Sequence, residues 1–145
     1  KAGMAVPRLS EASLERLASF FTLVGASYQN PIDMGSNRDH FGEILSTLIG
    51  DENIDVLVMQ LSAQMWVRTP NLIEGQIADL TEVRRQQEKP VAVVVVAPLP
   101  QRQFEAVTTI ETKLRAAGIP SYPTYERAAT ALKKVADYYR FHRGD

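Results

Sequence analysis

The chain contains no cysteine, and it carries almost no net charge. Without cysteine there is no disulfide framework, no zinc site built on thiolates and no cysteine nucleophile. A net charge of −1 gives no electrostatic reason to bind nucleic acid or an anionic membrane surface. The longest apolar run, residues 91–97, is too short to cross a bilayer. We therefore expect a cytoplasmic protein that binds neither nucleic acid nor a membrane.

The sequence also lacks the common catalytic motifs. It has no glycine-rich dinucleotide fingerprint, no P-loop and no Gly-x-Ser-x-Gly segment. Of the two histidines, His40 lies in the first turn of an expected helix, where the helix dipole disfavours a charged imidazole. His142 lies in a basic tail, and the two histidines do not have metal-ligand spacing. We predict no catalytic residue, no metal site and no self-sufficient catalytic centre in these 145 residues.

The length and composition are those of one globular domain. The chain has 145 residues, of which 45% are hydrophobic and 23% are charged, enough to build a single core. No linker, repeat or low-complexity segment divides the sequence. We therefore predict one domain over residues 1–145.

Apolar runs alternate with amphipathic segments along the whole chain. Residues 54–61 and 91–96 are typical of strands buried on both faces, residues 119–122 of a short outer strand, and residues 4–7 of an edge strand. Helices are expected to begin after Ser10, near His40, at Pro70, ahead of Phe104 and near Tyr125, with Gly50 and Gly118 just past two helix ends.

The expected core follows from these runs. We predict full burial of six strand residues, Val56, Leu57, Val58, Val93, Val94 and Val95. The helical stripes with the clearest period are Leu14, Leu17, Ala18 and Phe21; Phe104, Val107, Ile110 and Leu114; and Ala128, Ala129, Leu132, Val135, Ala136 and Tyr139.

This alternation predicts an α/β fold with a mostly parallel sheet flanked by helices. A doubly wound sheet normally begins with a central strand and a helix, whereas Ala2-Gly3 is typical of the end of a helix. The interpretation is a flavodoxin-like sheet that lacks its first strand and first helix. On this interpretation the chain is a fragment of a larger one.

One candidate site is the turn at residues 30–37, between two helices. Asn30-Pro31 stops regular structure, and Gly35 permits a tight bend. Ser36, Asn37 and Asp39 can each cap the helix that begins near His40. A glycine-containing turn at a helix N-terminus is a common site for phosphate or carboxylate. The alternative is a well-capped connection with no ligand, in which Asp33 only stabilises the turn.

A second candidate site is the segment Ser62–Thr69, expected as a loop at the carboxyl end of a buried strand. Ligands in open α/β sheets bind at that end. The segment places a hydroxyl, an amide, an indole and a guanidinium ahead of a helix that Thr69 caps and Pro70 begins. This set is suited to a phosphoryl group. The alternative is a structural loop whose Met65 and Trp66 pack on the core or on a partner.

Several segments together resemble the NDP-forming acyl-CoA synthetases, relatives of succinyl-CoA synthetase. They are NPIDMGSN at 30–37, IDVLVMQLSAQM at 54–65, KPVAVVVV at 89–96 and AAGIPSYPTYERAATALKKVADY at 116–138. Their order and spacing, rather than any one motif, carry the resemblance, which covers nearly the whole chain. The matching part is the second flavodoxin-like, ligase-CoA domain of these enzymes.

The resemblance implies a reaction that interconverts acyl-CoA, ADP and phosphate with a carboxylic acid, CoA and ATP. The full enzyme uses Mg and passes through an acyl phosphate and a phosphohistidine, which two helix N-termini cradle. Here the implied phosphate-binding residues are Ser62, Ala63, Gln64, Arg68 and Thr69, and the turn near the site contains Asn30, Asp33, Gly35, Ser36 and Asn37. Succinyl-CoA synthetases have glycines where Ser62 and Ala63 stand.

The implied partners are the other parts of the synthetase, namely its CoA-binding, phosphohistidine and ATP-grasp domains. None of these, and no Ser-His-Thr-Gly segment, occurs in the sequence. We therefore expect no cofactor in this chain and no activity from it alone. The alternative is a stand-alone flavodoxin-like binding or regulatory module. An FMN electron carrier is disfavoured, because flavodoxin-type phosphate loops follow the first strand, which this chain is expected to lack.

Overall fold

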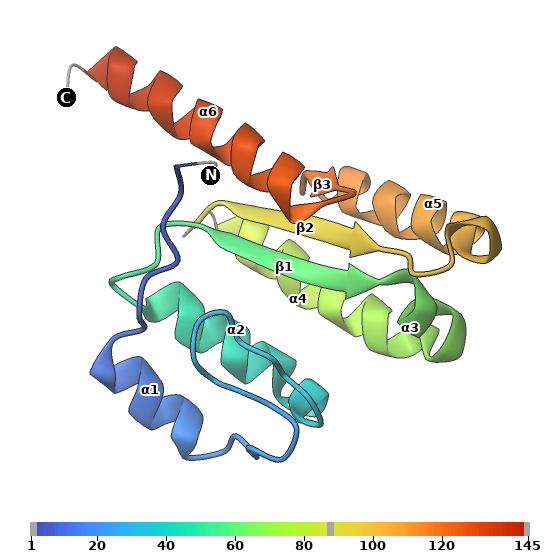
Figure 1. Cartoon of the computed structure of the whole chain (residues 1–145), viewed down its shortest axis with the longest axis horizontal. Helices are drawn as coiled ribbons and strands as arrows, with labels where there is room; N and C mark the ends of the chain where they lie inside the picture. Colours follow the sequence, from blue (N-terminus) through green and yellow to red (C-terminus); the bar gives the residue numbers. More distant parts are fainter. Residues whose placement is uncertain (1–2, 87–88, 144–145) are drawn as a thin grey trace.

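Three parallel strands form one open sheet with helices on both faces (Figure 1). The structure is a computed structural model that describes residues 3–86 and 89–143. The strands are β1 (Leu57–Ser62), β2 (Val91–Val96) and β3 (Ser121–Tyr122), in the order β1-β2-β3. The helices are α1 (Glu11–Ala18), η1 (Asn37–His40), α2 (Phe41–Gly50), α3 (Ala63–Arg68), α4 (Pro70–Gln86), α5 (Pro100–Ala116) and α6 (Tyr125–Arg143). This arrangement confirms the α/β class with a parallel sheet flanked by helices, and it is consistent with a flavodoxin-like fold.

Strand β2 is the centre of the sheet, and its bounds are those predicted. Its first five residues are buried, because β1 and β3 flank it and helices cover both faces. Val91, Val93 and Val95 join the main core, which α4 and α5 also line, whereas Ala92 and Val94 lie on the opposite face. An unbroken valine run is therefore a strand covered on both sides.

Strand β1 differs from its prediction in extent and burial. It begins at Leu57 rather than Ile54, and the burial predicted for Val56 and Val58 is wrong, since both are only half-buried. Gln60, on the same face of β1, is exposed. The reason is that β1 is an edge strand, so among the described residues no strand covers its outer side. Leu57 is buried as predicted.

Three further boundaries were predicted wrongly. Residues 4–7 form no strand. Phe21 is buried but lies beyond α1, which ends at Ala18. Gly50 is the last residue of α2 and not the residue after it, and Asp51 follows with extended backbone. The N-cap at Ser10 is confirmed, because its side chain accepts a hydrogen bond from the Ser13 N–H.

The burial predicted for α5 is right for Ile110 and Leu114 and wrong at the start of the helix. Phe104 is 71% exposed, and the buried positions are Gln103, Ala106, Ile110 and Leu114. The Gln103 side chain folds back and accepts a hydrogen bond from the Leu99 N–H at 3.1 Å, which closes the first turn of the helix.

The other end of α5 agrees with its prediction. Gly118 adopts a φ of 69°, and its N–H donates to the Arg115 carbonyl. The Ile119 N–H donates to the Leu114 carbonyl at 2.9 Å. This is the hydrogen-bond pattern of a helix that ends on a left-handed glycine.

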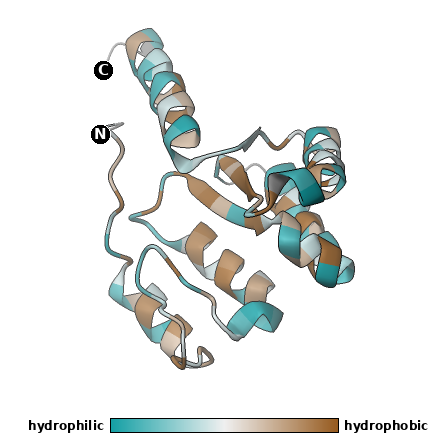
Figure 2. Cartoon of the chain, turned by 45° about the vertical axis from the view of Figure 1, so that its right-hand side comes forward, coloured by the Kyte–Doolittle hydropathy of each residue, from teal (hydrophilic) through white to brown (hydrophobic). Residues whose placement is uncertain are grey.

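Helix α6 covers the other face of the sheet, and its cover ends partway along its length. Ala128 is fully buried, but Val135 and Tyr139, further along the predicted stripe, are more than half exposed. The helix packs on β2 and β3, and its C-terminal half extends away from the body (Figure 2). The stripe prediction is therefore right for the first turns and wrong for the later ones.

Asp51 joins the N-terminal segment to the loop that precedes β1. It is 1% exposed, and its carboxylate accepts hydrogen bonds from the Ser10 N–H and hydroxyl at 2.9 and 3.1 Å and from the Asn53 N–H at 2.8 Å. Lys89 donates to the Asp51 carbonyl oxygen. The buried charge is thus compensated by several donors, as a buried carboxylate requires.

We expect Asp51 to make folding pH-dependent below about pH 4, near its unfolded pKa. Burial alone raises the pKa of this carboxyl, but hydrogen bonds from Ser13, Asn53 and Ser10 outweigh burial and lower the pKa below 3.8. A lowered folded-state pKa stabilises the fold above the unfolded value, and this stability is lost as the pH falls through the folded pKa. Thermal unfolding of the wild type and of Asp51→Asn tests this. The difference between the unfolding midpoint temperatures of the two proteins should shrink from pH 5 to pH 2.5. A difference that stays constant would contradict the expected pH dependence.

Candidate functional site

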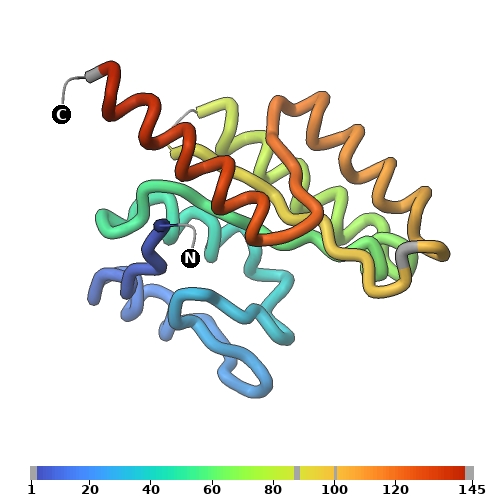
Figure 3. Tube along the Cα trace, turned by 45° about the horizontal axis from the view of Figure 1, so that its top comes forward, coloured from blue at the N-terminus to red at the C-terminus, as the bar shows by residue number. Residues whose placement is uncertain are grey.

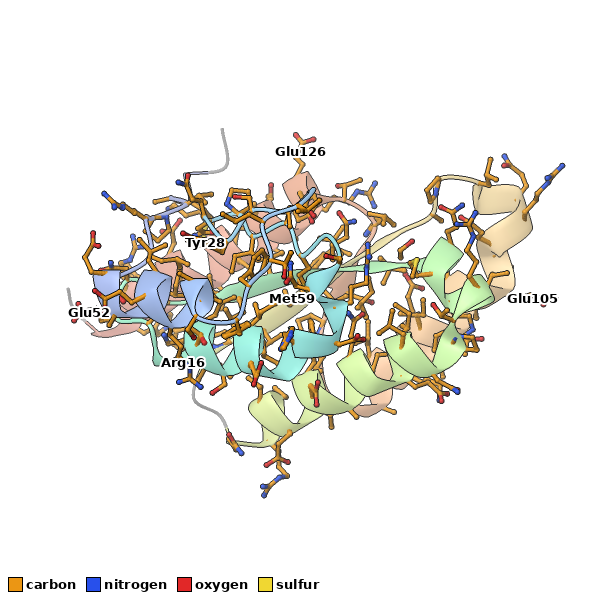
Figure 4. The ribbon with its side chains drawn as sticks, turned by 90° about the horizontal axis from the view of Figure 1, so that it is seen from below. Arg16, Tyr28, Glu52, Met59, Glu105 and Glu126 are labelled. Carbon is orange, nitrogen blue, oxygen red and sulfur yellow. The ribbon has the colours of Figure 1, made fainter. Side chains whose placement is uncertain are left out.

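Segment Ser62–Thr69 lies at the carboxyl end of β1, but it is not the predicted loop. Residues Ala63–Arg68 form the short helix α3, which starts directly after the strand. The Ser62 hydroxyl caps this helix by accepting a hydrogen bond from the Met65 N–H at 3.3 Å. Figure 4 shows α3 at the same end of the molecule as Glu105, opposite the end marked by Glu52. Chain direction and a serine cap therefore place a helix N-terminus at the carboxyl edge of the sheet.

Thr69 ends α3 instead of capping α4 with its side chain. Its N–H and its hydroxyl both donate to the Met65 carbonyl, at 2.7 and 3.1 Å. Pro70 begins α4, as predicted. The predicted N-cap role of the Thr69 hydroxyl is therefore wrong, because α3 supplies a nearer carbonyl for this donor.

The remaining residues of the segment differ in their exposure. Ala63 is fully buried in the core, Gln64 is half-buried, and Arg68 and Thr69 are exposed. Only exposed or half-buried side chains can reach a ligand. Arg68, Gln64 and the Ser62 cap are thus the groups of this segment best placed for an anion.

Trp66 is partly exposed and packs against the main core. The Lys113 Nζ of α5 lies 5.7 Å from the centre of the indole ring. The same ammonium pairs with Glu74 of α4 at 3.1 Å. Trp66 therefore links α3 to α5 through a cation–π contact, next to the carboxyl edge of the sheet.

The turn at residues 30–37 uses its polar groups to hold its own shape. The Asp33 carboxylate accepts a hydrogen bond from the Gly35 N–H at 3.1 Å. The backbones of Asp33 and Ser27 exchange two hydrogen bonds of 2.8 Å. Gly35 adopts a φ of 50°, and a Cβ there would lie 2.6 Å from the Gly25 carbonyl oxygen. Asp33 thus stabilises the turn, and glycine is the residue that fits at position 35.

Asn37 is buried and ties this turn to Thr22, near the start of the loop that follows α1. Its Oδ1 accepts from the Thr22 N–H at 2.7 Å, and its Nδ2 donates to the carbonyls of Thr22 and Met34 at 2.8 and 2.9 Å. The Asn30 side-chain Nδ2 donates to the Pro7 carbonyl at 2.9 Å, in the N-terminal segment.

The capping prediction for the helix near His40 is wrong. The chain first forms the 3₁₀ helix η1, and the side chain of Ser36 makes no capping hydrogen bond to it. His40 precedes α2 and also makes no side-chain cap, because its Nδ1 pairs with Glu43 at 2.6 Å. The side chain of Asn37, which was expected to cap the helix, makes its hydrogen bonds to backbone groups of the preceding loop instead.

The structure does not bring the two predicted segments into one site. Among the residues described, no hydrogen bond joins residues 30–37 to residues 62–69. An open hollow of about 200 Å³ lies between η1–α2 and α4, and neither segment lines it. Its walls are Arg38, Asp39, Phe41 and Gly42 on one side and Asn71, Leu72, Gly75, Gln76 and Asp79 on the other. Its charges are of both signs, so it does not favour an anion.

The sequence analysis missed this hollow, for a reason visible in α4. Gln76 is buried next to Ile77 and within the apolar stripe of that helix. The helical period of the apolar residues does not show whether a single glutamine among them is buried or exposed. Its exposure depends on how close α2 lies to α4.

Comparisons with protein-family models, with curated proteins and with solved structures found no match to this chain. In the described ranges, no three His, Cys, Asp or Glu side chains are grouped as a metal ion requires. Within the same ranges, no helix combines the length and the apolar composition needed to cross a membrane.

Proposed function

We propose that this chain is the second flavodoxin-like domain of an NDP-forming acyl-CoA synthetase. The observation that supports the proposal is the passage from β1 through the Ser62 cap into α3, at the carboxyl end of a parallel sheet. Open α/β sheets bind their ligands at this end. The sequence segments that resemble the synthetases include this passage.

The proposed role of the domain is to present a phosphate-binding edge to a phosphohistidine on another domain. The first N–H groups of a helix lack partners within the helix and attract anions. The Ser62 hydroxyl satisfies one of them, at Met65. The exposed Arg68 would steer phosphate towards this edge, and Gln64 would donate a further hydrogen bond. Thr69 would have to release the Met65 carbonyl before its hydroxyl could contribute.

The covalent chemistry of the reaction would take place on other domains. The histidine that carries the phosphate, the CoA site and the ATP-grasp domain with its Mg are not in this sequence. The proposed contribution of this chain is binding and positioning. The acyl group would not be selected here.

Phosphate titration of the full-length gene product tests this role. We expect amide shifts at Ser62, Gln64 and Arg68, and about three- to tenfold weaker binding in Arg68→Gln, because one partly screened charge contributes on the order of 1 kcal/mol. The matched control is Arg127→Gln, which removes an exposed arginine from α6. Phosphate that shifts other residues and leaves this segment unchanged would overturn the proposed role.

The isolated 145-residue chain should form no ATP from any acyl-CoA with ADP and phosphate. The reason is that its sequence contains no Ser-His-Thr-Gly segment to carry the phosphoryl group. Luciferase detection of ATP, with succinyl-CoA synthetase as a positive control, measures this directly. Turnover by the purified chain would contradict the assignment of the chemistry to other domains.

A further inference from the structure

Gln76 is a buried glutamine whose amide has no partner inside the fold. It is 5% exposed, and it lies within the apolar stripe of α4, next to Ile77. Among the described residues, no hydrogen bond reaches this amide, and every side-chain N or O atom that is completely buried has a partner. The little surface that Gln76 exposes therefore includes its amide atoms. Because buried polar groups are nearly always paired, this amide requires an explanation.

The Gln76 amide opens into the hollow between η1–α2 and α4, which Gln76 lines. Both helices lie on the face of the sheet opposite α6, so α6 does not cover the hollow (Figures 1 and 3). Gln103, which is equally buried, shows the usual arrangement, because its Oε1 accepts from the Leu99 N–H at 3.1 Å. A leucine at position 76 would complete the apolar stripe without an unpaired amide. The polar group at this position therefore serves the hollow and not the core.

Charged side chains of both signs line the same hollow. Asp79 of α4 and Asp39 of η1 supply carboxylates, and Arg38 supplies a guanidinium. Within residues 3–86 and 89–143, these side chains form no ion pair. Arg38 donates to the Gly35 carbonyl, which holds its guanidinium beside η1. The hollow thus offers partners for a positive group and for a negative group, next to an amide that can both donate and accept.

Two glycines keep the hollow open. A Cβ at Gly42 of α2 would lie 3.6 Å from the Asp79 Oδ2, and a Cβ at Gly75 of α4 would meet no atom within 4 Å. The volume is about 200 Å³. At about 30 Å³ for each water-sized group, this is space for roughly six or seven such groups. Leu72 adds an apolar wall. The space is therefore that of a small molecule with an apolar part.

We propose that this hollow binds a small zwitterion, namely an α-amino acid with a short side chain. Its carboxylate pairs with Arg38, and its ammonium pairs with Asp79 and Asp39. The Gln76 amide makes a hydrogen bond to this charged head, and the side chain of the ligand lies against Leu72. A simple anion would face two carboxylates, and a simple cation would face the guanidinium. A zwitterion is the ligand whose charges match the lining on both sides.

Three small probes test this charge pattern in the 145-residue chain, with NMR of the Gln76 side-chain amide as the readout. L-Alanine carries both charges, whereas propionate lacks the ammonium and ethylamine lacks the carboxylate. L-Alanine should shift the amide resonances saturably, with a dissociation constant on the order of 1 mM, as expected for so small a ligand. Propionate and ethylamine should each bind at least about tenfold more weakly, because each loses charge-assisted hydrogen bonds.

Two variants alter the lining without removing Gln76. Asp79→Asn should weaken L-alanine binding about tenfold, since the ammonium loses a charged partner. The matched control is Asp55→Asn, which changes an exposed aspartate ahead of β1 and should leave binding unchanged. Gly75→Leu places a side chain in the open space and should abolish binding. Because leucine is a better helix former than glycine, Gly75→Leu should not lower the unfolding midpoint temperature.

Gln76→Leu and Gln103→Leu form a matched pair of equally buried positions. Gln76→Leu should weaken L-alanine binding at least about tenfold, measured at the Gly42 amide, without lowering the unfolding midpoint, since no hydrogen bond of the fold is lost. Gln103→Leu should leave binding unchanged. It should lower the midpoint by about 2–4 °C, because the Leu99 N–H loses its acceptor. Circular dichroism measures both midpoints.

Other results would overturn the proposal. Propionate or ethylamine that binds as well as L-alanine would mean that the hollow selects a single charge. The absence of a saturable shift with L-alanine, or binding that survives Gln76→Leu, would mean that the amide meets only water. An equal loss of stability in Gln76→Leu and Gln103→Leu would show that Gln76 has a partner inside the fold. None of these readouts involves phosphate or ligase activity, so their failure leaves the proposed function untouched.

Discussion

Asp51→Ala should lower the free energy of unfolding by about 2–4 kcal/mol, one of the two largest effects we predict. The substitution removes the buried acceptor of the Ser10 and Asn53 N–H groups, whose hydrogen bonds to it are partly buried. Each buried donor that loses its partner costs about 1–3 kcal/mol. Urea denaturation followed by circular dichroism measures the change.

Two control variants isolate the cause of this effect. Asp51→Asn keeps one acceptor oxygen and should lose about half as much stability. Glu52→Ala removes an exposed neighbouring carboxylate and should cost less than about 0.5 kcal/mol, as most surface substitutions do. If Asp51→Ala were as mild as Glu52→Ala, Asp51 would not hold the N-terminal segment in place.

Ile110→Ala should destabilise the fold by about 3–4 kcal/mol, because Ile110 is fully buried and its truncation leaves a cavity. Phe104→Ala, in the same helix, removes a larger side chain but should cost less than about 1 kcal/mol, since Phe104 is 71% exposed. The same urea titration measures both variants. Equal losses would mean that α5 buries the Phe104 face and that its orientation in the structure is wrong.

The sequence predicted those elements whose signal is local. The valine run of β2 and the left-handed glycine at Gly118 each depend on a few neighbouring residues, and both agree with the structure. The N-cap at Ser10 belongs to the same group. Capping, turn chemistry and continuous apolar runs act over short distances, so they can be recognised without knowing the packing.

The errors concern features that depend on packing. Phe104 fits the helical period of α5 as well as the buried Gln103 does. Only the Gln103–Leu99 hydrogen bond and the packing of α5 show which of the two side chains is buried. The exposure of Val58 depends on whether a strand lies next to β1. The inward turn of Asn37 depends on a loop fifteen residues away in sequence. Periodicity contains no information on any of these.

The candidate site was predictable in position but not in detail. The rule for open sheets correctly located the Ser62 segment at the carboxyl edge. It did not predict that residues 63–68 form a helix, or that the Thr69 hydroxyl binds the Met65 carbonyl. Phosphate binding by this segment stays a prediction.

ATP formation by the full-length gene product tests the central claim most directly. Purified protein is incubated with ADP, phosphate, Mg and a panel of acyl-CoA thioesters, and ATP and free CoA are measured together. The proposal predicts equimolar ATP and CoA with at least one thioester, and a loss of rate in Arg68→Gln that Arg127→Gln does not share. No ATP with any thioester from a folded protein would contradict the proposal and favour a binding or regulatory module.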